Sequence, residues 1–162
     1  MIFFDYDGVL GNTEIGLFDE YKRLKEKQPD LTKIQYLIDF DWHGWLRKSG
    51  PKNDAFVILR AHDPQKASIL TRCWSVNEAK EKILYIRENK VKNSIIIVPY
   101  DLPKSTIVDA EGNILVEDQR CNIAEWCEAG GIGLLFSEIP VEGWRTISSI
   151  EEAFEFARKK EL

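Results

Sequence analysis

The stretch IFFDYDGVL, residues 2–10, places two carboxylates, Asp5 and Asp7, directly after a short hydrophobic run and directly before Gly8. An apolar run that ends in polar residues is typical of a parallel strand buried on both faces, which delivers its last side chains to one edge of a sheet. Carboxylates in such a place are costly unless solvent or a bound group stabilises them. The stretch therefore predicts a buried strand followed by a loop that carries reactive acids.

Four further short apolar runs end in or near polar residues, and helical patterns lie between them. The runs are 67–70 before Thr71, 94–98 before Pro99, 114–116 before Glu117 and Asp118, and 132–136. Strands that alternate with helices predict an α/β fold with a parallel central sheet.

Three segments after residue 66 have helical patterns. Residues 76–89 predict a crossover helix that presents Lys and Glu on one face and an apolar face made of Ala79, Ile83, Leu84 and Ile86. Residues 123–129 predict a short helix that ends at Gly130, and residues 150–159 predict a helix behind Ser148 or Ser149.

Residues 11–66 interrupt this alternation, because they contain helical patterns and no convincing strand. We expect three helices there, with a break at 49–51. Their markers are an apolar stripe of Leu17, Phe18, Tyr21 and Leu24, a second stripe of Leu31, Ile34, Leu37 and Ile38 behind Asp30 as N-cap, and the segment 54–61. The expected organisation is an α/β core formed by 1–10 and 67–162, with a helical cap insert formed by 11–66.

The composition excludes several classes of function. The 162 residues have a formal net charge of -5, which argues against a general electrostatic hold on nucleic acid. Three scattered cysteines, Cys73, Cys121 and Cys127, predict neither a disulfide framework nor a zinc site. The first residues lack the basic start of a signal peptide, and no run of about 18 apolar residues occurs. We expect a soluble cytoplasmic protein with no membrane partner, whose oligomeric state the sequence leaves open.

The polar residues at the strand ends form a set suited to phosphoryl transfer. Asp5 can attack a phosphorus atom, and Asp7 can first protonate the leaving group and then deprotonate a water molecule. Thr71 can hold a phosphate oxygen, and Lys104 can neutralise charge. Magnesium prefers oxygen ligands, so Glu117 and Asp118 can complete a metal site with the first acids. The expected partner is a small phosphorylated substrate.

In this order, the motifs resemble those of the haloacid dehalogenase (HAD) superfamily of phosphatases. The resembling segments are residues 3–10 for the first motif, 69–71 for the second, Lys104 for the third and 114–118 for the fourth. The resemblance implies a three-layer Rossmann-like fold, with Asp5 as nucleophile and Asp7 as acid/base. It also implies that Asp5, the backbone carbonyl of Asp7 and Asp118 hold Mg²⁺, while Thr71 and Lys104 bind the phosphate.

Within the superfamily, the helical insert and residues 117–122, followed by Trp126 and the pair 130–131, are similar to the 5′-nucleotidase or deoxyribonucleotidase-like branch, which implies a nucleoside or deoxynucleoside monophosphate as substrate. The fourth motif of that branch usually reads as two aspartates, whereas Glu117 stands first here. A sugar phosphate or another small metabolite is the alternative substrate. Phosphotransfer to a second hydroxyl and a binding module without turnover are the alternative functions.

Several alternatives stay open at this point. Residues 106–117 match a β-hairpin by pattern, whereas the resemblance requires 113–118 to be a parallel strand, which we follow. Arg72 either contacts substrate or points to solvent, and Asn122 either caps a helix or lies near the metal. An aromatic group in the insert either stacks a base or forms the core of the cap; its members are Phe40, Trp42, His43 and Trp45.

Overall fold

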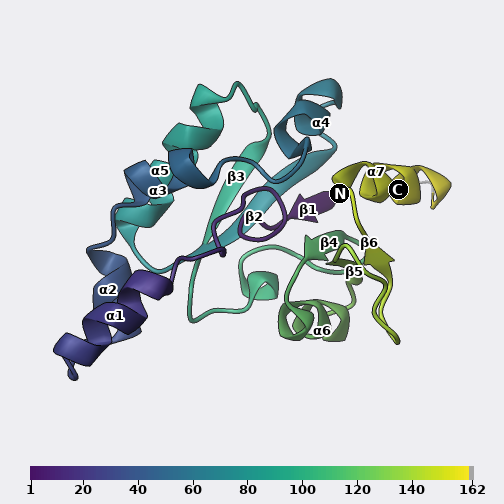
Figure 1. The fold of residues 1–162 in the computed structure, drawn as a ribbon. Coiled ribbons are helices and arrows are strands. Elements are labelled where there is room, and N and C mark those ends of the chain that lie inside the picture. Colours follow the sequence, from purple (N-terminus) through teal and green to yellow (C-terminus); the bar gives the residue numbers. More distant parts are fainter. Residues whose placement is uncertain (161–162) are drawn as a thin grey trace.

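The computed structural model describes residues 1–160. Within them, six strands form one sheet in the order β3-β2-β1-β4-β5-β6, and every neighbouring pair is parallel (Figure 1). The strands are β1 (Ile2–Phe4), β2 (Ala67–Cys73), β3 (Ser94–Pro99), β4 (Ile114–Glu117), β5 (Ile132–Phe136) and β6 (Thr146–Ile147). The predicted α/β class and the parallel sheet are confirmed.

Helices cover both faces of this sheet and give it three layers (Figure 1). They are α1 (Asp19–Lys27), α2 (Lys33–Ile38), α3 (Trp42–Ser49), α4 (Ala55–Ala61), α5 (Val76–Glu88), α6 (Arg120–Glu128), α7 (Ile150–Lys159) and the short 3-10 helix η1 (Lys104–Thr106). Helices α4, α5 and α7 pack on one face, and α6 packs on the other together with η1. No helix within residues 1–160 is long and apolar enough to cross a membrane.

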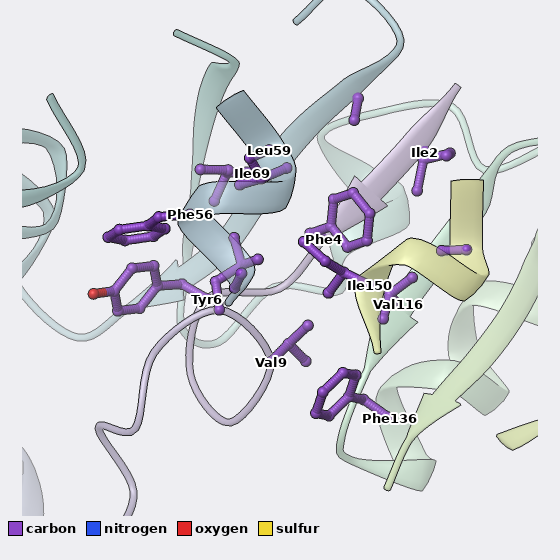
Figure 2. Packing of buried hydrophobic residues seen from close by; sticks show 14 of the residues in the cluster. Ile2, Phe4, Tyr6, Val9, Phe56, Leu59, Ile69, Val116, Phe136 and Ile150 are labelled. Atoms are coloured by element: carbon purple, nitrogen blue, oxygen red, sulfur yellow. The ribbon is translucent and has the colours of Figure 1, made fainter. Parts of the chain in front are cut away.

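The alternation of side chains along β1 divides the hydrophobic core between the two faces. Phe4 is fully buried and belongs to the larger cluster, which Figure 2 shows between the sheet, α4 and α7. Phe3 points to the opposite face, where its ring meets the edge of Trp126 from α6 at a centroid distance of 5.6 Å. Because β1 is covered on both sides and lies between β2 and β4, its carboxyl end is held rigidly at the middle of the sheet.

The segment 11–66 contains helices α1 to α4, and these do not all pack in the same place. A third cluster, separate from the two clusters on the sheet, contains Tyr36, Leu37 and Trp42 together with aromatic and aliphatic side chains from α1. Leu46 of α3 and Phe56 of α4 instead belong to the large cluster on the sheet. Helices α1 and α2 lie side by side and project away from α6 and α7 (Figure 1). The division of the chain into core and cap stays a prediction.

Some predicted elements need correction. The structure excludes the hairpin over 106–117, because β4 is parallel to β1 with Ile2 opposite Ile114. The N-cap of α2 is Thr32 and not Asp30, since the Thr32 hydroxyl and the Gln35 side chain form a reciprocal capping box. The sequence pattern missed α3 and β6. Strand β6 has only two residues, which is too short for an alternating pattern to appear.

Helix α7 begins at one of the two predicted caps and allows a direct test. The Ser149 hydroxyl accepts a hydrogen bond from the backbone N–H of Glu151, and the Glu152 carboxylate accepts from the N–H of Ser149. We expect Ser149→Ala to lower the free energy of unfolding by about 1 kcal/mol, because a helix N–H loses its partner. Urea denaturation measures this change. Ser148→Ala removes a hydroxyl that donates to the Glu152 carboxylate at 2.9 Å but keeps the capping hydroxyl of Ser149, so it should cost clearly less; equal losses would contradict the assignment.

Candidate active site

The loop after β1 turns sharply and brings two acids to the carboxyl edge of the sheet. The N–H of Asp5 donates to the carbonyl of Val116 at 3.0 Å, which ties this position to β4. Gly8 has φ of +74°, and a Cβ atom built there would lie 2.3 Å from Oδ2 of Asp118. Only glycine combines this backbone conformation with such a close approach. The loop therefore packs directly against the end of β4.

Three carboxylates from two distant segments meet at this edge. One oxygen from each of Asp5, Glu117 and Asp118 lies within 4.8 Å of the others. Asp5 and Glu117 are buried, and Asp118 is partly buried. Parallel strands β1 and β4 are neighbours, so their last residues must end side by side. The predicted approach of Asp5 to Asp118 is confirmed.

Lys104 supplies a buried positive charge to this cluster. Its Nζ atom donates to Oδ1 of Asp5 at 2.7 Å and to Oε2 of Glu117 at 2.6 Å, and the residue is 3% exposed. Burial by itself would lower the pKa of Lys104, but the Asp5 and Glu117 carboxylates outweigh it and raise that pKa. The predicted cation therefore lies beside the predicted nucleophile.

The cluster has three carboxyl groups and only one ammonium group, that of Lys104. A divalent cation would balance this excess of acids. Burial, and next the charge of Glu117, raise the pKa of Asp5 to about 7. Burial, followed by hydrogen bonding to Glu117, raises the pKa of Asp118 to about 10. Oδ1 of Asp118 is buried and has no hydrogen-bond partner among residues 1–160. Hard oxygen ligands with unsatisfied capacity suit magnesium, so the residues fit the predicted metal.

Glu117 differs from the other two acids in its contacts. One of its oxygens accepts from Lys104, and the other accepts from the backbone N–H groups of Asp118 and Gln119 at 3.2 and 3.3 Å. Burial tends to raise the pKa of Glu117, but the Lys104 charge and these hydrogen bonds lower it overall. Glu117 is thus an ionised carboxylate with both oxygens in use.

Asp7 is held by two donors that no motif indicated. Its Oδ1 accepts from the hydroxyl of Thr13 at 2.5 Å, and its Oδ2 accepts from Nζ of Lys82 at 2.5 Å. Lys82 lies on α5 and is fully buried, with Glu78 as a second partner at 2.7 Å. Burial would lower the pKa of Lys82, but Asp7 and Glu78 raise it well above its ordinary value. Lys82 is therefore a buried ammonium group.

Lys82 was missed because the buried face of α5 was predicted wrongly. Ile83 and Leu84, expected on the apolar face, are 37% and 43% exposed. The residues that α5 buries are Glu78, Glu81, Lys82, Tyr85 and Ile86. The overlooked signal is the spacing of Glu78 and Lys82. They are four residues apart and lie on the same face of the helix as Tyr85 and Ile86, so they can form an ion pair within a buried face.

The remaining predicted residues lie close to this centre but have different surroundings. Thr71 is fully buried, and its hydroxyl is 3.4 Å from Nζ of Lys82. Arg72 pairs with Glu125 of α6 at 3.0 Å, and its Nε is buried without a partner among the described residues. Asn122 stands inside the first turn of α6, whose N-cap is Gln119, so the capping alternative is wrong.

A cavity of about 350 Å³ opens in front of Asp5 and Asp7. Its wall combines charged groups with aromatic rings. The lining residues are Asp5, Asp7, Thr13, Glu14, Leu17, Phe18, Trp42, Arg72, Trp74, Glu78, Tyr100, Lys104, Gln119 and Asn122. The rings of Trp74 and Tyr100 stack on each other, with an interplanar angle of 21°. Thr71 and Asp118 are not part of this wall.

The aromatic group predicted in the insert packs largely on itself: Trp42 is buried, Phe40 and Trp45 are partly buried, and His43 is exposed. Phe40 packs edge-on against both Trp42 and Trp45, at centroid distances of 5.0 and 5.6 Å. Of the four residues singled out, only Trp42 reaches the cavity. His43 pairs with Glu81 of α5 at 2.9 Å. These contacts favour the alternative in which the group forms a small hydrophobic core.

Comparison with known proteins gives likeness in structure only. No protein-family model matches the sequence, and no curated protein matches it. A hydrolase from Pseudomonas syringae is similar with a TM-score of 0.68 at 12% identity, over 96% of this chain and 98% of that chain. A HAD phosphatase from Thermococcus onnurineus gives a TM-score of 0.63 at 13% identity, over 96% of both chains.

A HAD-hydrolase from Bacillus subtilis, solved bound to magnesium, has a TM-score of 0.59 at 12% identity and covers 97% of both chains. At such low identity, these matches establish the fold and leave the chemistry to the residues. The parallel sheet, the acids at its carboxyl edge and these neighbours agree with one another. This chain has the fold of the HAD-superfamily hydrolases.

Proposed function

We propose that this protein is a magnesium-dependent phosphomonoesterase of the HAD superfamily, which acts through an aspartyl-phosphate on Asp5. The observation that carries the proposal is the meeting of Asp5, Glu117 and Asp118 with oxygens within 4.8 Å, beside the buried Lys104. A carboxylate nucleophile, a cation and a further acid that is free to bind a metal ion are what the transfer of an anionic phosphoryl group requires.

In the first half-reaction, the free oxygen of Asp5 attacks phosphorus and the bond between phosphorus and the ester oxygen breaks. Asp7 gives a proton to the departing alkoxide, so that it leaves as a neutral alcohol. Lys104 holds the other oxygen of Asp5 and thereby orients the nucleophile. Arg72, in the cavity wall, is placed to bind the substrate's phosphate or its neighbouring hydroxyl groups.

In the second half-reaction, Asp7 takes a proton from a water molecule, which attacks phosphorus and breaks its bond to Asp5. Inorganic phosphate leaves, and the Asp5 carboxylate is restored. One residue serves both steps, because the acid of the first step is the base of the second. Both acids line the same cavity, which is what this double role needs.

Asp5, Asp118 and the backbone carbonyl of Asp7 would hold the Mg²⁺ ion. When bound, the ion would neutralise charge between the nucleophile and the phosphoryl group. Glu117 has both oxygens engaged by Lys104 and by backbone N–H groups. We therefore assign Glu117 the role of positioning Lys104.

The substrate we propose is a nucleoside or deoxynucleoside monophosphate. Support comes from the aromatic part of the cavity wall, where Phe18, Trp42, Trp74 and Tyr100 face the same space as Asp5. Flat aromatic bases stack on such side chains with little dependence on base identity. Glu14, Gln119 and Asn122 add hydrogen-bonding groups suited to ribose hydroxyls.

Phosphate release from 4-nitrophenyl phosphate, with magnesium and with a chelator, tests the reaction class. We expect turnover with Mg²⁺ and a loss of roughly 10²-fold or more after chelation, because the clustered acids would then oppose the phosphoryl anion. A screen of nucleoside monophosphates and sugar phosphates tests the substrate class, and nucleotides should give the higher kcat/KM.

The outcomes separate the alternatives. Turnover of sugar phosphates without any nucleotide would overturn the substrate class and leave the chemistry in place. No release from any substrate, with any divalent ion, would overturn the enzymatic proposal and favour a binding module. Transfer of phosphate to an added alcohol in place of water would identify a phosphotransferase.

A further inference from the structure

Lys82 is a buried cation for which the proposed reaction has no assigned role. Its side chain is completely buried, and Nζ lies 2.5 Å from Oδ2 of Asp7 and 2.7 Å from Oε1 of Glu78. Two weaker contacts, at 3.4 Å, reach the Thr71 hydroxyl and the carbonyl of Arg72. These partners come from the loop after β1, from β2 and from α5, so Lys82 stands where that loop meets the helix layer.

Stability alone does not account for an ammonium group at this place. Burial removes the hydration of a charge, and a buried ion pair is often no more stable than apolar residues of similar volume. The rings of Tyr6 and Trp42 also lie near Nζ, at 5.4 and 5.9 Å. Apolar residues in place of the whole ion-pair group would avoid this desolvation cost. The charge at position 82 therefore points to a role in placing its partners.

Asp7 is the partner that faces the reaction. Its carboxyl group lines the cavity with Asp5, and each of its oxygens has one donor. Lys82 holds one oxygen from the side of α5, and Thr13, which is 1% exposed, holds the other from the segment after the loop. Two contacts in different directions remove the rotation that a single hydrogen bond would allow.

We propose that Lys82 is a positioning residue that, together with Thr13, fixes the Asp7 carboxyl group in the cavity wall beside Asp5. The inference rests on the proposed phosphatase function, because it assigns Lys82 to the acid/base step of that reaction. Proton transfer requires the acid within about 3 Å of the oxygen that it protonates. An Asp7 side chain that swings away from this place cannot protonate the leaving group.

The choice of leaving group distinguishes a positioning role of Lys82 from a purely structural one. Phenolate is a poorer leaving group than 4-nitrophenolate and needs more help from an acid, although the two phosphate esters have similar shapes. The ratio kcat/KM reports the steps up to transfer to Asp5, so it is unaffected by slow hydrolysis of the intermediate. Damage to the fold alone lowers kcat/KM for both esters by the same factor.

We expect Lys82→Met to lower kcat/KM for phenyl phosphate by roughly 10²-fold, within the range of general acid catalysis. The loss for 4-nitrophenyl phosphate should be at least about tenfold smaller, and Asp7→Asn should show the same pattern. Lys80→Met is the matched control, because Lys80 is an exposed lysine on the same helix. It should leave both values within a factor of about two.

A single change at Lys82 leaves two carboxylates without their cation, and the variant can fail to fold for that reason. Lys82→Met combined with Glu78→Gln removes one of these charges, and thermal unfolding shows which variant is folded. Equal losses on both esters, or no loss, in a folded variant would overturn the positioning role while phosphatase function stands. If the wild-type protein releases phosphate from neither ester and from no nucleotide or sugar phosphate, the proposed function fails first, and the inference fails with it.

Discussion

Asp5→Asn is expected to reduce phosphate release by roughly 10³-fold or more, because an amide cannot act as the nucleophile. The substitution keeps the size of the side chain, and its carbonyl oxygen can still accept from Lys104, whose Nζ lies 2.7 Å from Oδ1 of Asp5. Substrate binding should therefore change far less than kcat. Steady-state kinetics with 4-nitrophenyl phosphate and magnesium measures both quantities.

Two checks make this result specific. Circular dichroism and thermal unfolding should show that Asp5→Asn folds normally, since a neutral group in the acid cluster removes like-charge repulsion. Asp30→Asn applies the same chemical change to an exposed aspartate and should retain full activity. An Asp5→Asn protein with kcat close to wild type would exclude the aspartyl-phosphate mechanism.

Asp118→Asn is expected to have opposite effects on magnesium binding and on stability. Loss of a charged ligand should weaken Mg²⁺ binding by about 100-fold or more, as measured by isothermal titration calorimetry. Without metal, the same change should raise the free energy of unfolding by roughly 1 kcal/mol, because it removes a carboxylate that burial and like charge make unfavourable. Burial and its neighbours raise the pKa of Asp118 to about 10, which marks this cost.

Thermal unfolding with and without magnesium shows both effects in one experiment. The wild-type protein should gain stability as the Mg²⁺ concentration rises, since the ion binds the folded state. The Asp118→Asn variant should begin from a higher midpoint and gain little, while Asp30→Asn should behave like wild type. Equal stabilisation of Asp118→Asn and wild type by magnesium would remove Asp118 from the metal site.

The meeting of Asp5 and Asp118 could be predicted from the sequence because of strand geometry. Each residue follows a short run of buried apolar side chains, and the carboxyl ends of neighbouring parallel strands share one sheet edge. The resemblance to a known family was needed for Lys104, because the pattern over 106–117 by itself slightly favoured a hairpin. The structure places Lys104 in η1, next to β4, where it reaches both Asp5 and Glu117.

Lys82 could not be found in this way, because hydrophobic periodicity assigns charged residues to the solvent. On α5 the rule fails, since Glu78 and Lys82 neutralise each other inside the protein while Ile83 and Leu84 remain exposed. Whether a lysine is buried depends on carboxylates that approach from other segments. Asp7 is such a partner, and it is 75 residues away in the chain.

Sequence patterns also failed to identify which aromatic residues line the cavity. Phe40, Trp42 and Trp45 attract notice as a possible base-binding surface, yet they mainly pack on one another. Trp74 and Tyr100, which follow β2 and β3, stack in the wall of the cavity instead. The ends of β2 and β3 are brought together by the parallel pairing of Cys73 with Pro99.

The sequence by itself determined the α/β class and the acids at the strand ends, because these follow from local patterns: apolar runs, helical spacing and the residues that terminate them. For 113–118 the pattern alone favoured a hairpin, and the parallel strand followed only from the family resemblance. Only the tertiary structure decided which charges are buried, how Asp7 is held between Thr13 and Lys82, and which rings line the cavity. These properties depend on side chains from distant segments, whose mutual desolvation and hydrogen bonding exist only after the chain has folded.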